Sequence, residues 1–488
     1  MVKDGLYWAD LLRSKKISYI ELADLIEQKV KQLNPRLNAL VSFDKKAALD
    51  RYQQKKAWDE RLFAGLPLPL KMLGQDKKGW QATSASRLLK ENRAQTTTNF
   101  VRALEKNGLI AIGQSNSPEF GFKNVTDSLL YGNSCNPWNI AYFSGGSSGG
   151  AASAVASGMF PIAAASDGGG SIRIPASFSG LIGLKPTRGT MPLGPDGFRG
   201  WQGASIAFAL TVSMRDTQAL FYAMRGTETA APYQAPKVEW DHPQKISAKK
   251  LKVAFTTTSP VGSDVSEDAQ LAVLQAAEFL SKQGHTIKEI KLPVKGIELM
   301  QSYYQMNGAE TAAMMADISQ KLKRPIVKED MELMSWALYQ YGKKQRAASY
   351  IHALNVWDQA AVEMENLMTD FDLILTPTTA HHAPKISDDL QSEDIRKELN
   401  KIESYSEKAA ATLIYQMFEK SLRLSPFTQL ANLTGQPAIS LPTYLTQDGL
   451  PLGIQFMAAK GREDRLFQIG KLFEEQHQFC LPPAYKKE

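Results

Sequence analysis

Cysteine and histidine are both scarce in this sequence, with 2 cysteines and 6 histidines among 488 residues. Cys135 and Cys480 are far apart and stand in no metal-ligand spacing, so a disulfide framework is not expected and a reducing compartment is indicated. The histidines, which include the adjacent pair His381 and His382, lack a third ligand at helical spacing. We therefore expect no metal and no cofactor.

Long hydrophobic runs are also missing. The longest near-apolar run, from Ala154 to Ala165, contains Ser157, Gly158 and Pro161 and is too short to cross a bilayer. The N-terminal stretch MVKDGLYWADLLRSKK has neither an apolar signal-peptide core nor a small-residue cleavage site. These absences predict a cytoplasmic protein that does not bind a membrane.

Charge of one sign is not in large excess. The 57 Lys and Arg residues against 50 Asp and Glu residues give a net charge of +7. Only KISAKKLK, which starts at Lys245, is locally dense, so we interpret the basic residues as solvated surface and expect no nucleic-acid partner. With 43% hydrophobic and 22% charged residues, the composition indicates a globular protein with a large core.

Helical and strand patterns alternate along the first half of the chain. Ser18 is a good N-cap for a helix from Tyr19 to Leu33, after which Pro35 should turn the chain into a short strand. GLPLPLKMLG, Gly65 to Gly74, is typical of a buried strand, and a helix at Asn99 to Asn107 precedes the strand GLIAIGQ. The alternation predicts an α/β architecture with buried strands.

The second half of the chain shows a different pattern of expected elements. Residues 227–249 are rich in proline and charge and should form a surface connection. LKVAFT then begins a strand, and a helix follows that should stop at Gly284. Residues from about 297 to 423 are mostly helical in pattern with one strand at FDLILTPTT, and the chain ends as strand, strand, helix.

Two Gly/Ser clusters, GGSSGG and DGGGS, flank an apolar segment. In DGGGS the glycines leave backbone N–H groups uncovered, so a turn there can present several donors to one point. An oxyanion hole needs such donors, and Ser171 stands where a nucleophile would follow them. A tight structural turn and a phosphate cradle fit the same residues.

GGSSGG matches the G-x-S-x-G nucleophile elbow twice, at Ser147 and Ser148. That elbow must follow a buried strand, whereas the preceding NPWNIAYF contains proline and two asparagines. We therefore do not expect an elbow. No histidine lies in a Gly/Ser-rich setting, so a histidine base is not supported either.

Lys71 interrupts the apolar stretch GLPLPLKMLG, so its side chain either snorkels to the surface or is desolvated. Burial disfavours the ammonium form and lowers the pKa, which makes a neutral amine available near physiological pH. A Ser-Lys pair is then able to activate a hydroxyl without imidazole.

The chain resembles the amidase signature family over nearly its whole length. GGSSGGAASAVASG followed by SDGGGSIRIPASFSGLIGLKPTRG is similar to the family's signature block. GLPLPLK, SNSPEFG and YGNSCNPWN resemble the blocks before it, and SPFTQLANLTGQPAISLP with GLPLGIQ those after it. The resemblance implies one α/β domain, residues 1–488, with a central mixed, twisted β-sheet surrounded by helices. Within it we expect an N-terminal helical segment (about 5–60), a signature core (about 61–225) and a variable substrate-pocket region (about 297–423).

The resemblance also implies a Ser-cisSer-Lys triad that hydrolyses amides through an acyl-enzyme. Carried over by position, the nucleophile is Ser171, the bridging serine next to a cis peptide bond is Ser147, and the base is Lys71. The oxyanion hole falls on the backbone of Gly168, Gly169, Gly170 and Ser171.

Supporting roles are expected for three further residues. Ser148 and Asp167 should orient Lys71 and the turn, and Arg173 should anchor the loop through a buried ion pair. The family usually has Ile or Thr where this chain has Gly168, so we expect a looser loop, of the form found in peptide-type amidases and oligoamide hydrolases. Tyr303, Tyr304, Met306 and Trp336 either line an apolar pocket or pack in the core.

The expected partner is a small-molecule amide, and the protein is expected to act as a monomer or homodimer. Two alternatives stay open: the catalytic A-type subunit of a tRNA-dependent amidotransferase, and a non-catalytic binding protein on the same scaffold. The presence of Lys71, Ser147 and Ser171 together favours a hydrolase.

Overall fold

An eight-stranded mixed sheet forms the centre of the protein in the computed structural model, which describes residues 2–54, 57–238 and 250–486. The strand order is β12-β11-β13-β15-β14-β9-β10-β8. β11 pairs in parallel with β12 and β13, and the other neighbours are antiparallel. The strands are β8 (Ala163–Asp167), β9 (Ile182–Lys185), β10 (Ile206–Thr211), β11 (Lys252–Phe255), β12 (Thr286–Glu289), β13 (Leu373–Pro377), β14 (Ala438–Leu445) and β15 (Pro451–Met457).

A smaller sheet in the order β1-β3-β2 stands beside β8. Its strands are β1 (Leu40–Phe43), β2 (Leu66–Lys71) and β3 (Leu109–Ser115). The two sheets therefore meet where β2 lies beside β8. Two side chains cross this junction: Gln75, just after β2, donates to the Ala165 carbonyl at 2.8 Å, and Lys71 reaches Ser166. This junction positions the site described below.

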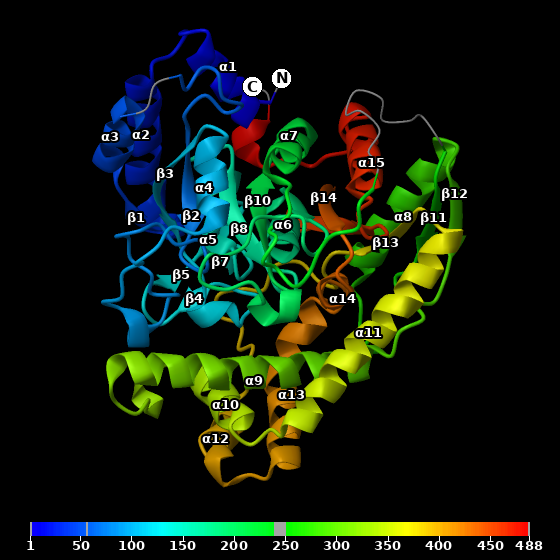
Figure 1. Cartoon of the computed structure of the whole chain (residues 1–488). Coiled ribbons are helices and arrows are strands. Elements are labelled where there is room, and N and C mark those ends of the chain that lie inside the picture. Colours follow the sequence, from blue (N-terminus) through cyan, green and yellow to red (C-terminus); the bar gives the residue numbers. More distant parts are fainter. Residues whose placement is uncertain (1, 55–56, 239–249, 487–488) are drawn as a thin grey trace.

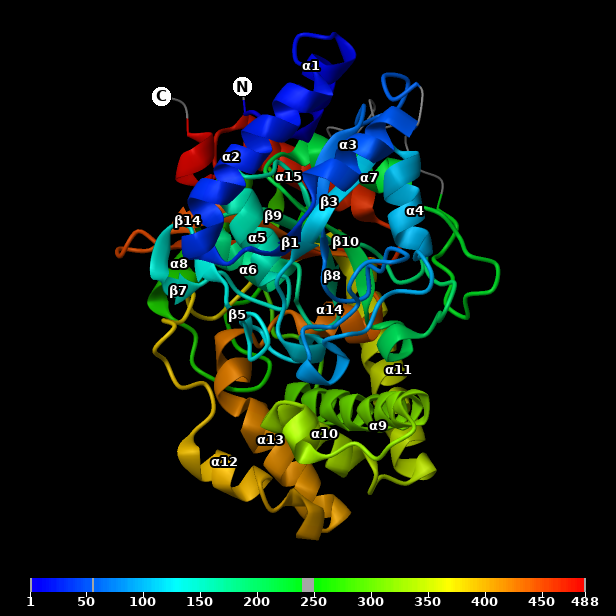
Figure 2. The ribbon, with the colours of Figure 1, turned by 90° about the vertical axis from the view of Figure 1, so that its left-hand side faces the viewer.

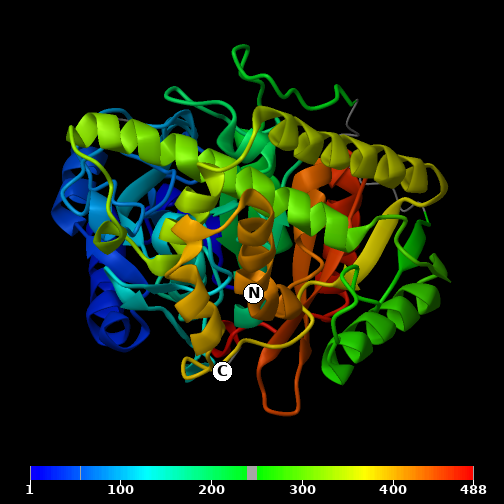
Figure 3. The same cartoon turned by 90° about the horizontal axis from the view of Figure 1, so that it is seen from below.

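Helices surround both sheets (Figures 1 and 2), as the α/β prediction requires. Figure 3 shows the long α9 crossing beneath the sheets. The helices are α1 (Gly5–Arg13), α2 (Tyr19–Leu37), α3 (Lys45–Gln54), α4 (Asn99–Lys106), α5 (Gly149–Ala156), α6 (Arg173–Ser179), α7 (Met214–Met224), α8 (Glu267–Lys282), α9 (Gly296–Leu322), α10 (Leu333–Gly342), α11 (Ala347–Asp370), α12 (Glu393–Leu399), α13 (Glu407–Leu424), α14 (Gln429–Thr434) and α15 (Glu463–Glu475).

Most helices of the stretch predicted to be helical form a separate layer, which α11 leaves (Figure 1). α9, α10, α12 and α13 lie together on one side of the sheets, at the bottom of Figures 1 and 2, and only β13 from this part of the chain joins the large sheet. The predicted subdivision of the chain stays a prediction. None of the helices in the described part is both long and apolar enough to cross a membrane.

The prediction that Pro35 ends its helix is wrong. α2 begins after the Ser18 capping box as expected but continues to Leu37, with Asn38 in the left-handed conformation as its cap. Proline at this position removes only one bond, to the carbonyl of the exposed Lys31, which water can solvate. The predicted connection at 227–249 and the basic stretch KISAKKLK lie partly outside the described residues.

Candidate active site

Lys71 and Ser147 meet at the junction of the two sheets. Lys71 ends β2, and its Nζ lies 2.8 Å from Ser147 Oγ. The same Nζ donates to Ser166 Oγ at 3.0 Å and is 3.5 Å from the Ser166 carbonyl oxygen. A neutral amine has two N–H bonds and one lone pair, so two acceptors on Ser166 leave the lone pair for the Ser147 hydroxyl.

Burial makes that neutral amine available. Lys71 is 1% exposed, and desolvation lowers its pKa from 10.5 to about 7, although the negative charge of Asp167 acts in the opposite direction. The sequence left open whether Lys71 snorkels or is desolvated. The structure settles this point, since the whole side chain lies inside the protein.

The GGSSGG loop, between β7 (Asn139–Phe143) and α5, holds Ser147. The peptide bond between Gly146 and Ser147 is cis, as the family resemblance implied. A side chain on Gly146 would have its Cβ 2.6 Å from the Val125 backbone, so glycine is needed for this close approach. β7 is short and largely exposed, which agrees with rejecting the nucleophile elbow.

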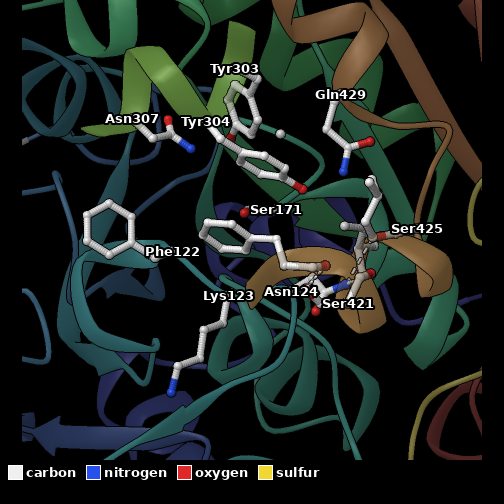
Figure 4. Close-up of a pocket in the computed structure, with 15 residues that line it drawn as sticks. Phe122, Lys123, Asn124, Ser171, Tyr303, Tyr304, Asn307, Ser421, Ser425 and Gln429 are labelled. Atoms are coloured by element: carbon white, nitrogen blue, oxygen red, sulfur yellow. Dashed lines mark hydrogen bonds between the residues drawn. The ribbon is translucent and has the colours of Figure 1, made fainter. Parts of the chain in front are cut away.

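Ser171 follows β8 and stands just before α6, which starts at Arg173. It lines two neighbouring cavities. The larger, of about 450 Å³, is also lined by Ser147 and Ser166, and the smaller, of about 50 Å³, by Tyr303 and Tyr304. Figure 4 shows Ser171 in the smaller cavity. Both predicted serines thus face the larger cavity.

The predicted set of four backbone oxyanion donors needs one correction. The Gly170 amide donates to Asp167 Oδ1 at 2.7 Å and is therefore not free for a substrate. The amides of Gly168, Gly169 and Ser171 have no acceptor among the described residues. Three donors of the predicted set remain.

The loop around these donors is held firmly, contrary to the expectation for an extra glycine. Tyr303 donates its hydroxyl hydrogen to the Gly168 carbonyl at 3.1 Å, and Thr428 donates to the Gly169 carbonyl at 2.8 Å. A Cβ on Gly168 would lie 2.9 Å from the Trp201 ring. The indole thus occupies the place of the missing side chain, and Gly168 is required by this contact.

Asp167 and Arg173 form the expected buried ion pair, with both side chains 0% exposed. Asp167 accepts from Arg173 Nε at 3.0 Å and Nη2 at 2.9 Å. Arg173 also donates to Gln455 and Asn432, at 2.6 Å each. Despite its burial, the arginine charge and hydrogen bonds keep the pKa of Asp167 below its usual value. The pair anchors the turn that carries Ser171.

Ser148 acts one step further from Lys71 than expected. Its Oγ donates to the Ser166 carbonyl at 3.2 Å and accepts from the Ser166 amide at 3.4 Å. Ser166 therefore stands between Ser148 and Lys71 and bonds Lys71 directly. The sequence reasoning gave Ser166 no role. Its position next to Asp167 in SDGGGS was the available signal. Asp167 affects Lys71 through its charge and orients the turn by direct bonds.

The aromatic and methionine side chains whose role was left open divide into two groups. Tyr303 and Tyr304 line the smaller cavity, whereas Met306 and Trp336 do not line either cavity and are buried among core residues. Thr428 and Trp201, which shape the loop at Gly168 and Gly169, were not singled out from the sequence at all.

A comparison with protein families matches residues 21–467 to the family described as Amidase. A lipoamidase of Enterococcus faecalis is 40% identical over 485 residues, which cover 98% of this chain but 64% of the relative. The chain therefore spans about two thirds of that enzyme.

A 6-aminohexanoate-cyclic-dimer hydrolase of Pseudomonas sp. (strain NK87) is 30% identical and matches 97% of this chain and 94% of its own length. A solved structure of 6-aminohexanoate cyclic dimer hydrolase complexed with substrate superposes with a TM-score of 0.88 at 29% identity. It covers 99% of this chain and 98% of that one.

Proposed function

The chain belongs to the amidase family, and we propose that it hydrolyses carboxylic amides with Ser171 as nucleophile, Ser147 as proton relay and Lys71 as base. The observation that carries this proposal is the buried contact of 2.8 Å between Lys71 Nζ and Ser147 Oγ, on a lysine whose pKa burial lowers to about 7. A non-catalytic scaffold would gain nothing from a desolvated lysine directed at a serine hydroxyl.

The reaction begins with a proton relay. Ser171 Oγ attacks the amide carbonyl carbon and passes its proton to Ser147, whose own proton moves to the neutral Lys71 amine. The new O–C bond gives a tetrahedral intermediate with a negative oxygen. The amides of Gly168, Gly169 and Ser171 supply the donors for that oxygen.

Collapse of the intermediate reverses the relay. The Lys71 ammonium returns a proton through Ser147 to the departing nitrogen, so the C–N bond breaks and an amine or ammonia leaves. Water then attacks the acyl-enzyme by the same relay and releases the carboxylate, which restores Ser171. No cofactor or metal enters these steps.

The substrate class follows from the cavities and the relatives. A cavity of about 450 Å³ with Phe122, Trp201 and Met314 in its lining has room for a group larger than an ammonia leaving group. The names of the relatives, a lipoamidase and a 6-aminohexanoate-cyclic-dimer hydrolase, point to amides with long aliphatic parts. We propose a linear small-molecule amide of the peptide-amide or oligoamide type, hydrolysed in the cytoplasm by a monomer or homodimer.

Hydrolysis by the purified protein alone tests the function. The panel contains simple aliphatic amides, aryl amides, peptide amides and glutamine, and glutamine as the single substrate would favour the amidotransferase subunit instead. Ser171→Ala should abolish turnover and labelling by a fluorophosphonate. Ser157→Ala, which removes a hydroxyl that caps α5 away from both cavities, is the matched control. Labelling of Ser171→Ala at another serine would refute the assignment.

A further inference from the structure

The smaller cavity beside Ser171 is lined mainly by uncharged polar side chains. Three come from helix α9, and the others come from the loop after β3, from the turn after β8, from α13 and the residue that follows it, and from α14 (Figure 4). The polar uncharged residues of the lining, apart from Ser171, are Asn124, Tyr303, Tyr304, Asn307, Ser421, Ser425 and Gln429. A core pocket would be apolar, so this lining indicates a ligand with polar groups.

Three amide oxygens in this lining are buried without a hydrogen-bond partner among the described residues: Asn124 Oδ1, Asn307 Oδ1 and Gln429 Oε1. Asn307 is 3% exposed and Gln429 8%. The orientation of Asn124 is fixed, because its Nδ2 donates to the Ser421 carbonyl at 2.8 Å and to Ser425 Oγ at 3.0 Å. These three oxygens have almost no accessible surface, so they lie behind the wall of the cavity and do not face a ligand.

Tyr304 adds a group that both donates and accepts. Its ring stacks on Phe418 with centroids 4.5 Å apart, which fixes the direction of the hydroxyl. That hydroxyl has no hydrogen-bond partner among the described residues, and Figure 4 shows it turned toward the side of the cavity where Gln429 and Ser425 lie. The cavity thus offers a hydroxyl that is able both to donate and to accept a hydrogen bond.

The charges around the cavity exclude ionic ligands. Lys123 is the charged residue of the lining, and its ammonium is paired with Asp127 and Glu332, pointing away from Ser171 in Figure 4. With no carboxylate in the lining, an ammonium has no counter-ion. A carboxylate has no free cation in the lining, because the Lys123 ammonium is already paired. A neutral group that donates and accepts, such as a carboxamide, fits both limits.

The proposed relay indicates which part of the substrate enters each cavity. Ser147 must protonate the departing nitrogen, and Ser147 lines the larger cavity but not the smaller one. The amine part therefore occupies the larger cavity, and the acyl part extends into the smaller one. Resting on the proposed function, we propose that the cavity around Tyr304, Gln429 and Asn124 binds a second carboxamide in the acyl part of the substrate. The enzyme is then selective for diamides and longer oligoamides.

The test compares matched p-nitroanilides. One series carries an acetamido group two to six methylenes from the scissile carbonyl, and the other a straight hydrocarbon acyl chain of equal length. We expect kcat/KM to favour the acetamido member by roughly tenfold at the best spacing. Tyr304→Phe and Gln429→Met should each reduce that preference, the ratio of kcat/KM for the acetamido member to kcat/KM for the hydrocarbon member, by about three- to tenfold.

Tyr415→Phe is the matched control, because it removes a hydroxyl from a neighbour of Tyr304 that does not line this cavity. If the preference for the acetamido member over the hydrocarbon member is the same in the wild type and all three variants, the subsite is overturned and the proposed function stands. A second arm uses hexananilides with an acetamido or an isobutyl group on the aniline ring. A preference seen in that arm instead would overturn the acyl assignment. If the wild-type protein hydrolyses amides of the panel described above but no anilide of either arm, the subsite falls and the proposed function stands; if it hydrolyses neither set, both fall.

Discussion

Lys71 Nζ and Ser147 Oγ lie 2.8 Å apart, inside the protein, at the junction between two sheets. The lysine comes from the last residue of β2, and the serine from the loop before α5, 76 positions later. The contact therefore forms only when β2 and this loop pack together. Because the pair is desolvated, the protonation state of Lys71 affects both activity and stability, and both should rise as pH increases.

The activity of the enzyme should depend on pH through Lys71. The neutral amine is the base, and its pKa is about 7, so kcat/KM should fall about tenfold per pH unit below 7 and level off above it. Initial rates between pH 5 and 9 measure this profile. Lys71→Arg, which stays protonated throughout, should be inactive over the whole range. A flat profile for the wild-type protein would show that another group is the base.

The same burial should make the protein less stable at pH 7 than at pH 9. The folded-state pKa of about 7 is below the ordinary value of 10.5, so between these values the unfolded chain binds more protons, and stability rises with pH. Keeping Lys71 neutral at pH 7 costs on the order of 4 kcal/mol. Lys71→Met should remove this dependence and raise the free energy of unfolding at pH 7.

Denaturant unfolding at pH 7, 8 and 9 measures that change. The control is Lys282→Met, which alters an exposed lysine paired with Glu278 and should keep the wild-type dependence. A Lys71→Met variant that is less stable than wild type at pH 7 would contradict the argument.

The contact between Gly168 and Trp201 predicts that a substitution of Trp201 partly restores the activity lost on substitution of Gly168. Gly168→Ala places a Cβ 2.9 Å from the indole, which must displace the oxyanion loop or the ring. We expect kcat to fall roughly ten- to a hundredfold. Adding Trp201→Ala should restore part of the loss, because the two residues are in direct contact.

Gly226→Ala is the control for that pair, since a Cβ there meets no atom within 4 Å. Purely additive effects of the Gly168 and Trp201 substitutions on kcat would exclude the proposed contact as the cause.

Arg173→Met should be strongly destabilising. It leaves the Asp167 carboxylate buried and without its cationic partner, which typically costs about 3 to 5 kcal/mol. Arg396→Met, which breaks pairs with Asp389 and Glu393 at 37% exposure, should cost about 1 kcal/mol or less. Thermal unfolding of the two variants measures the difference. Equal losses would show that the buried pair does not hold the turn.

Much of the fold and of the candidate site was predictable from local patterns. Apolar periodicity gave the helices α4 and α8 and the strands β2 and β3, because these elements bury one face or both. The position of Lys71 in an apolar strand marked it as either snorkelling or desolvated, and its burial in the structure decided between the two. The Pro35 prediction failed because the freed carbonyl lies on an exposed part of the helix, where water replaces the lost bond.

The sequence by itself determined which residues are available for chemistry: a lysine inside a buried strand, and two serines in glycine-rich turns. Only the tertiary structure decided how they are held. Ser166 meets Lys71 across 95 positions, Asp167 takes the Gly170 amide out of the oxyanion set, and Trp201 fills the place beside Gly168. The contacts of Ser166 with Lys71 and of Trp201 with Gly168 join segments that are distant along the chain. They depend on how strands and helices pack against one another, which no local sequence pattern specifies.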